Sequence, residues 1–148
     1  MVGSEPINNR PKPYEALRKE KDMKVLVVDD SRSMRRLISM ALKHIGETDI
    51  VEAEDGVQAI YKLQEALPDL ILLDWNMPNM SGIQFLKRIK GHDKLKHIPV
   101  IMVTSEGKSS EIQAALDAGA ESYVVKPFKP QDLAQRIRNM RTAEAEAG

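Results

Sequence analysis

Residues 24–30 read KVLVVDD and residues 70–74 read LILLD, so two unbroken apolar runs each end in aspartate. A short continuous apolar run is typical of a strand that is buried on both faces of a parallel sheet. The carboxyl ends of parallel strands lie at one edge, so Asp29, Asp30 and Asp74 would meet there if the two strands are neighbours. Because clustered carboxylates repel one another, we expect this cluster to hold a divalent cation.

Length and composition favour a single globular domain. The chain has 148 residues, 42% of them hydrophobic, and 22 basic residues balance 22 acidic ones. A net charge of zero gives no overall attraction to nucleic acid or to an anionic membrane. The chain has no cysteine, which excludes disulfides and thiolate metal sites and fits a reducing compartment. With no secretory signal and no apolar stretch near the roughly 18 residues of a membrane span, we expect a soluble cytoplasmic protein.

Strand and helix patterns alternate along the chain. Five apolar runs predict strands at residues 25–28, 50–53, 70–73, 99–103 and 123–125. Apolar residues recur at helical spacing after each run, with helix starts expected at Asp55, Ser81, Ser110 and Pro130 and stops at Gly46 and Gly119. Five such units predict an α/β fold in which helices cover both faces of a parallel sheet.

Boundaries and helix faces follow from the same patterns. Residues 1–22 are polar and contain three prolines, which predicts a flexible N-terminal arm, and residues 141–148 are predicted to form a frayed tail after a domain at 23–140. Ser110 and Gln113 have the spacing of a capping box. In the second helix, the residues predicted to face the core are Val57, Ile60, Leu63 and Leu67.

The strand ends bring together a set of residues suited to phosphate chemistry, because ligands of doubly wound sheets bind outside these ends. Asp29 and Asp30 end the first strand, Asp74 the third, Thr104 the fourth and Lys126 the fifth. Mg²⁺ prefers oxygen ligands, often carboxylates together with phosphate, and lysine suits a phosphate oxygen. Since a carboxylate can accept a phosphoryl group, the set indicates Mg²⁺-dependent phosphoryl transfer to an aspartate.

Asp74 is the best placed acceptor. Asp69 borders the same strand but at its start, about 16 Å away at roughly 3.3 Å per residue. Histidine is a poor candidate, because His44, His92 and His97 lie at positions expected to be solvated.

Four segments together resemble the receiver domain of two-component response regulators, and among these the single-domain chemotaxis regulators. The segments are VDDS at 28–31, LDWNMPNMSG at 73–82, TSE at 104–106 and YVVKPF at 123–128. The resemblance covers about residues 23–140. It implies a five-stranded, doubly wound (βα)5 sheet of the flavodoxin-like type with strand order 2-1-3-4-5.

The resemblance also implies a metal site. Asp74 would be the phosphoacceptor, and Mg²⁺ would bind Asp30, Asp74 and the backbone carbonyl of Asn76. Asp29 would act on the metal through water. Asn76 and Glu106 stand at positions that tune dephosphorylation in the family.

The resemblance assigns the remaining residues to phosphate binding and switching. Thr104 and Lys126 would contact the phosphoryl oxygens, and Lys126–Pro127 would be a cis peptide. Thr104 and Tyr123 would form a switch pair, in which the hydroxyl moves toward phosphate and the ring swings inward. Trp75, the only tryptophan, is expected to be partly exposed beside the site.

A receiver with these features would be a stand-alone regulator rather than an enzyme, and its only reactions would be its own phosphorylation and slow dephosphorylation. A histidine kinase would be the phosphodonor, and a phosphatase could remove the group. We expect a monomer that signals by binding an output protein, such as the flagellar motor switch, through its fourth helix, fifth strand and fifth helix. Ser109 stands where the chemotaxis relatives are basic, which leaves a phosphorelay or another output open.

Two other functions compete with this interpretation. An aspartyl-phosphate hydrolase of the haloacid dehalogenase type also uses Mg²⁺ and aspartate, but its nucleophile lies in an Asp-x-Asp pattern after the first strand. A flavodoxin would need a Ser/Thr-rich loop for the FMN phosphate at that place. The pair Asp29 and Asp30 lacks the first pattern and would repel the phosphate of the second.

Overall fold

The computed structural model describes residues 23–46 and 49–147, and the expected N-terminal arm at 1–22 lies outside these residues. Strands and helices alternate as predicted. In chain order they are β1 (Lys24–Val28), α2 (Arg32–His44), β2 (Asp49–Ala53), α3 (Gly56–Glu65), β3 (Leu70–Leu73), α4 (Gly82–Lys90), β4 (Val100–Thr104), α5 (Ser109–Asp117), β5 (Ser122–Val125) and α6 (Pro130–Ala147).

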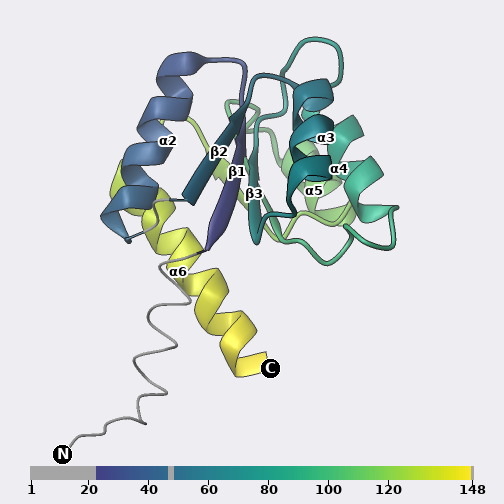
Figure 1. Ribbon diagram of the computed structural model, residues 1–148. Helices are drawn as coiled ribbons and strands as arrows, with labels where there is room; N and C mark the ends of the chain where they lie inside the picture. The colour runs from purple at the N-terminus through teal and green to yellow at the C-terminus, as the bar shows by residue number, and fades with distance from the viewer. Residues whose placement is uncertain (1–22, 47–48, 148) are drawn as a thin grey trace, which may run out of the picture.

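The strands form one parallel sheet in the order β2-β1-β3-β4-β5, which confirms the expected fold class. Helices α2 and α6 cover one face, and α3, α4 and α5 cover the other (Figure 1). The chain therefore reverses its winding direction between β1 and β3, and this is where ligands of such sheets bind.

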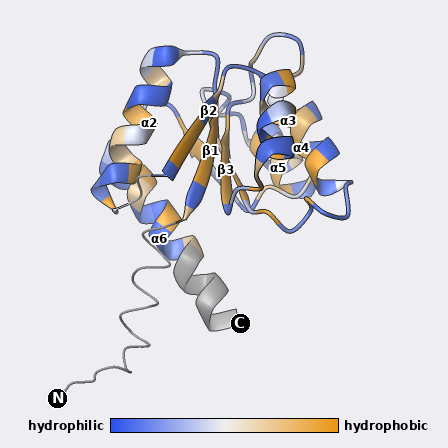
Figure 2. Cartoon of the chain, viewed as in Figure 1, coloured by the Kyte–Doolittle hydropathy of each residue, from blue (hydrophilic) through white to orange (hydrophobic). Residues whose placement is uncertain are grey.

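The core has two halves, one on each face of the sheet. Alternate residues of β1 show the division, because Val25 and Val27 pack toward α2 and α6 while Leu26 and Val28 pack toward α3, α4 and α5. Every residue of β3 and β4 is buried. Figure 2 shows β3 as apolar along its length, whereas the helices are apolar on one side. Burial on both faces explains why the strands appear in the sequence as unbroken apolar runs.

Most of the expected helix ends are confirmed. The Asp55 side chain accepts a hydrogen bond from the backbone N–H of Gln58 at 2.8 Å, and Ser81 forms a capping box with Gln84. Gly46 and Gly119 follow α2 and α5 with φ angles of 88° and 111°, in the left-handed region that favours glycine at a helix end.

The predicted capping box of α5 is wrong. The helix begins at Ser109 with Lys108 as its N-cap, and no side chain caps it. Ser110 consequently lies inside the first turn and is not the residue that precedes the helix. Gln113 instead donates to Asp117 at 2.8 Å, one turn further along.

Two residues predicted to face the core from α3 are exposed. Val57 is 42% exposed and Leu67 is 54% exposed. The buried face of α3 is centred on Gly56, Ala59 and Leu63, and a Cβ at Gly56 would lie 2.9 Å from Sδ of Met80. Leu67 lies beyond the end of the helix, so helical spacing does not apply to it.

The last helix is longer than expected. It was predicted to end near Met140, but α6 continues to Ala147. The added residues are mostly alanine and glutamate, which have high helix propensity. Among residues 23–46 and 49–147, the helices lack the combination of length and apolar character that crossing a membrane requires.

Candidate functional site

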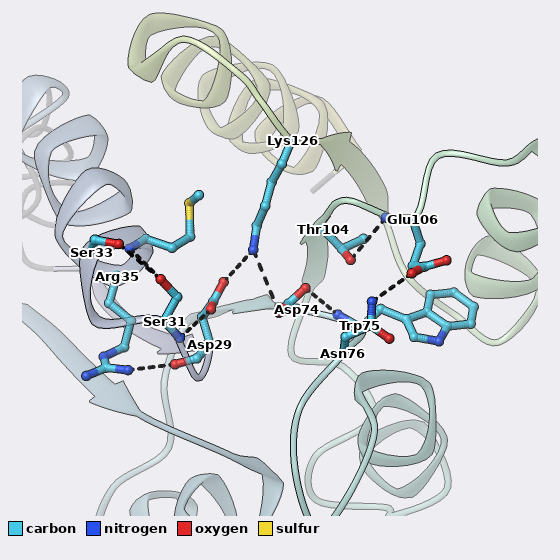
Figure 3. Close-up of polar contacts among 11 residues, drawn as sticks. Asp29, Ser31, Ser33, Arg35, Asp74, Trp75, Asn76, Thr104, Glu106 and Lys126 are labelled. Carbon is cyan, nitrogen blue, oxygen red and sulfur yellow. Dashed lines mark hydrogen bonds and ion pairs between the residues drawn. The ribbon is translucent and has the colours of Figure 1, made fainter.

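The ends of four strands meet at one edge of the sheet (Figure 3). Val28 and Leu73 are paired in register, which places the residues after them side by side. The backbone N–H of Asp74 donates to the carbonyl of Val28 at 3.0 Å. Thr104 ends β4, and Lys126 follows β5 with its side chain directed at the aspartates. The structure therefore brings together the residues that the sequence placed at this edge.

Three carboxylates form the centre of the site. Oxygens of Asp29, Asp30 and Asp74 all lie within 4.8 Å of one another. Asp29 is 1% exposed and Asp74 is 6% exposed, whereas Asp30 faces solvent. An all-oxygen set of this charge fits a hard divalent cation such as Mg²⁺. Asp69 is remote from this set, because it accepts a hydrogen bond from the backbone of Lys24 at the opposite end of the strand.

Lys126 partly neutralises the carboxylates. Its Nζ lies 2.8 Å from Oδ2 of Asp29 and 3.7 Å from Oδ2 of Asp74. The pKa of Asp74 is nevertheless raised above its ordinary value, first because the group is buried and second because Asp29 repels its charge. Lys126, the Thr104 hydroxyl and the backbone N–H of Trp75 act in the opposite direction but do not cancel the rise. Without a metal, the charged form of Asp74 is therefore less favourable in the site than it would be in water.

This excess of negative charge predicts that Asp74→Asn stabilises the metal-free protein. A folded-state pKa above the unfolded value means that Asp74 favours folding at acid pH and loses this contribution as the pH rises through the folded pKa. At pH 7 in EDTA, we expect the variant to melt a few degrees above the wild type, with the difference shrinking toward pH 4. Asp69→Asn, at the far end of β3, is the matched control and should not stabilise. A lower melting temperature for Asp74→Asn at pH 7 would show that attraction to Lys126 dominates.

Glu106 connects the site to Tyr123. The fully buried Thr104 accepts a hydrogen bond from the backbone N–H of Glu106 at 3.4 Å. The Tyr123 hydroxyl donates to the backbone carbonyl of the same residue. The ring of Tyr123 is 6% exposed, and burial raises its pKa to about 12, so the hydroxyl remains a donor. The Glu106 side chain accepts from Asn76 Nδ2 at 2.7 Å.

Two further residues support the site, and sequence reasoning gave neither of them this role. Gly82 was predicted to open a helix and to bend the loop after Asp74, but a Cβ there would also lie 2.0 Å from the backbone oxygen of Asp74. The sequence predicts no role for Arg35, yet its Nη1 donates to the backbone carbonyl of Asp29 at 2.7 Å. Both act on backbone atoms, which leave no pattern in the sequence.

Two expectations that came from the resemblance are met. Lys126–Pro127 is a cis peptide, and Trp75 is partly exposed. The backbone N–H of Trp75 donates to Oδ1 of Asp74 at 2.8 Å, so the indole belongs to the residue that directly follows the central carboxylate. His44, His92 and His97 are exposed, as expected.

Sequence comparison identifies relatives along most of the chain. Residues 25–138 match the response regulator receiver domain family. Chemotaxis protein CheY1 of Helicobacter pylori is 46% identical over 116 residues, which cover 78% of this chain and 94% of the relative. Chemotaxis protein CheY of Pseudomonas aeruginosa is 44% identical over 118 residues, which cover 80% of this chain and 95% of the relative.

Solved structures show the same fold. The chemotaxis response regulator CheY4 of Vibrio cholerae superposes with a TM-score of 0.74 at 36% identity, covering 80% of this chain and 98% of that one. The Mn²⁺-bound form of response regulator Rcp1 gives a TM-score of 0.68 at 28% identity, covering 81% and 92%. A divalent cation is thus present in a structure that shares this fold.

Proposed function

Because this chain belongs to the response regulator receiver domain family, we propose that it is a response regulator that accepts a phosphoryl group on Asp74. The family consists of signalling proteins rather than catalytic enzymes, and it implies a histidine kinase as the phosphodonor. The observation that carries the proposal is the cluster of three carboxylates, two of them buried, that faces Lys126. We place the receiver at residues 23–140 and expect it to act as a cytoplasmic monomer.

We assign the divalent cation as Mg²⁺. Asp30, Asp74 and the backbone carbonyl of Asn76 would bind it directly, and Asp29 would act through water. The close approach of the three carboxylates supports this assignment, because their mutual repulsion needs a counter-charge beyond Lys126. When bound, the cation would offset the charge of the carboxylates and of the phosphoryl oxygens.

In the proposed reaction, a carboxylate oxygen of Asp74 attacks the phosphorus of a phosphohistidine. The new O–P bond forms as the P–N bond breaks, and the imidazole leaves with the bonding electrons and takes up a proton. The Nζ of Lys126 would then form an ion pair with a phosphoryl oxygen, because the phosphorylated Asp74 no longer offers it a free carboxylate. The Thr104 hydroxyl would donate a hydrogen bond to another phosphoryl oxygen.

The same movement would change the output surface. Thr104 and Tyr123 bind the N–H and the carbonyl of Glu106, so a shift of the hydroxyl toward phosphate also disturbs the partner of the tyrosine. We place the output surface on α5, β5 and α6, where Arg136 donates to the Tyr123 carbonyl at 2.9 Å. The names of the relatives favour chemotaxis, and we propose an output protein such as the flagellar motor switch as the partner. Ser109 keeps a phosphorelay or another output as the second candidate.

Phosphorylation by a small phosphodonor tests the function. With acetyl phosphate and Mg²⁺, mass spectrometry of the intact protein should show a gain of one phosphoryl group, and EDTA should prevent it. A protein that stays unmodified would contradict the proposal. Sustained turnover of a generic phosphate monoester would instead support the hydrolase. A pull-down comparing the unmodified protein with its beryllofluoride-activated form would then identify the output partner.

Trp75 should report metal binding. The backbone N–H of Trp75 donates to Asp74 and its indole is partly exposed. A cation bound at the carboxylates therefore changes the electric field around the indole ring. We expect a saturable change in tryptophan fluorescence with Mg²⁺ that EDTA reverses. Because Trp75 is the only tryptophan, no other indole contributes. Calorimetric binding of Mg²⁺ without a fluorescence change would place the cation elsewhere.

A further inference from the structure

Arg35 is a buried cation directed at the backbone beneath the acidic cluster. The residue is 8% exposed. Its Nη1 donates to the carbonyl of Asp29 and its Nε to Oε1 of Glu52, both at 2.7 Å (Figure 3 draws the first). A buried charge is costly unless it is paired and hydrogen-bonded, and the side chain of Glu52 is itself 48% exposed. The arginine is therefore held by one partly solvated carboxylate and by the main chain of the site.

Asp29 is fixed at every polar atom. Its N–H donates to the carbonyl of Ala53 at 3.1 Å, and Oδ1 accepts from the N–H of Ser31 at 2.8 Å. Lys126 binds Oδ2 at 2.8 Å. Arg35 supplies the remaining contact, on the backbone oxygen, so it completes the set that orients this residue.

Asp30 depends on the same contact. Within the part of the chain that the structure describes, its side chain makes no hydrogen bond or ion pair, so only the backbone sets its position. A peptide group is planar, and the carbonyl of Asp29 shares its plane with the N–H and Cα of Asp30. Through its hydrogen bond to that oxygen, Arg35 orients the peptide group that leads to Asp30 and so helps to set the position of the Asp30 carboxylate.

We propose that Arg35 is a positioning residue for the divalent cation, which orients Asp29 and Asp30 through their shared peptide group. The proposal rests on the proposed function, because it presumes that these carboxylates bind the metal. Contacts behind the ligands of a metal site commonly decide its affinity, and losing one weakens binding about 10- to 100-fold. Arg35 fits that description although it touches no carboxylate of the cluster.

The test compares Arg35→Met with Arg36→Met in Mg²⁺ titrations followed by Trp75 fluorescence and calorimetry. The neighbouring Arg36 is exposed, so its variant loses the same charge without losing the backbone contact. We expect Arg35→Met to raise the Kd for Mg²⁺ about tenfold or more, and Arg36→Met to leave it within about twofold. Equal Kd values for Arg35→Met and the wild type would overturn the proposal. Failure of the wild type to bind Mg²⁺ would instead overturn the proposed function.

Arg35→Lys separates orientation from charge. Lysine keeps the charge but cannot reproduce the planar fork that holds two partners, so we expect its Kd to remain well above that of the wild type. Full recovery by lysine would show that charge alone matters and would contradict the positioning role. This variant also keeps the proposal testable if Arg35→Met does not fold.

A metal-free measurement completes the test. In EDTA, amide exchange at Ser31, whose N–H donates to Oδ1 of Asp29 at 2.8 Å, should be faster in Arg35→Met, while exchange at Leu72 in β3 stays unchanged. Uniformly faster exchange with an unchanged Kd would mean that Arg35 only stabilises the fold, and would overturn the proposal.

Discussion

Asp74→Asn is expected to abolish phosphorylation. With acetyl phosphate and Mg²⁺, the variant should show no gain of a phosphoryl group under conditions that fully modify the wild type. The reason is chemical, because an amide oxygen carries no negative charge and is a poor nucleophile. The Trp75 N–H donates a hydrogen bond to Asp74 in the wild type. The side-chain oxygen of asparagine can accept the same hydrogen bond, so the local structure should persist. Intact mass measured over a time course gives the result directly.

The stability of the same variant controls for unfolding. Because the pKa of Asp74 is raised by burial and by Asp29, removal of its charge should stabilise the metal-free fold. A variant that melts above the wild type yet takes up no phosphate has lost the nucleophile and not the fold. Asp69→Asn should be phosphorylated like the wild type, since Asp69 lies at the opposite end of β3. Equal phosphorylation of Asp74→Asn would refute Asp74 as the acceptor.

Gly82→Ala is expected to cause the largest loss of stability. The added methyl group would lie 2.0 Å from the Asp74 oxygen and 2.8 Å from the Trp75 Cα. These are backbone atoms of the strand end, which cannot rotate away as a side chain can. Overpacking of this kind costs about 1–3 kcal/mol, and sometimes more, and we expect a loss of about 3 kcal/mol in the free energy of unfolding. Urea denaturation would measure it.

The same substitution should weaken Mg²⁺ binding. Gly82 N–H donates to the Trp75 carbonyl at 2.7 Å, so moving the start of α4 also moves the segment that carries Asp74 and Asn76. Gly91→Ala is the matched control, because its nearest neighbour is a Lys87 oxygen at 3.2 Å, and it should change stability by less than about 1 kcal/mol. If Gly82→Ala and Gly91→Ala are equally stable, the close approach at Gly82 is not a constraint.

The parts of the fold that sequence predicts best are those that burial dictates. An unbroken run such as Leu70–Leu73 is covered on both faces, so its strand and the polar residue that ends it are both visible in the chain. The exposed Val57 was misplaced because apolar spacing does not distinguish a helix face centred on large residues from one centred on Gly56 and Ala59. Leu67 was misplaced because the helix ends at Glu65. Start positions also depend on backbone geometry, which explains the error at Ser110.

The candidate site divides in the same way. Its charged and hydroxyl side chains follow strands and could be assigned from the strand ends alone. Arg35 and Gly82 could not be assigned in this way. Arg35 donates to the carbonyl of Asp29, and Gly82 has no side chain that would clash with the carbonyl of Asp74. Any residue type could supply those carbonyls, so a single sequence contains no signal for the contact.

The arrangement at Glu106 allows the strength and the duration of a signal to be set independently. Its main chain meets Thr104 and Tyr123, whereas its side chain meets Asn76. In the proposed mechanism, residue 106 contributes to transmission only through its peptide N–H and carbonyl, which every amino acid except proline provides. Dephosphorylation would depend on the side chain. Substitutions at residue 106 could therefore adjust how long the phosphorylated state lasts while the hydrogen bonds from Thr104 to Tyr123 through its main chain stay intact. One fold could then serve pathways with different response times.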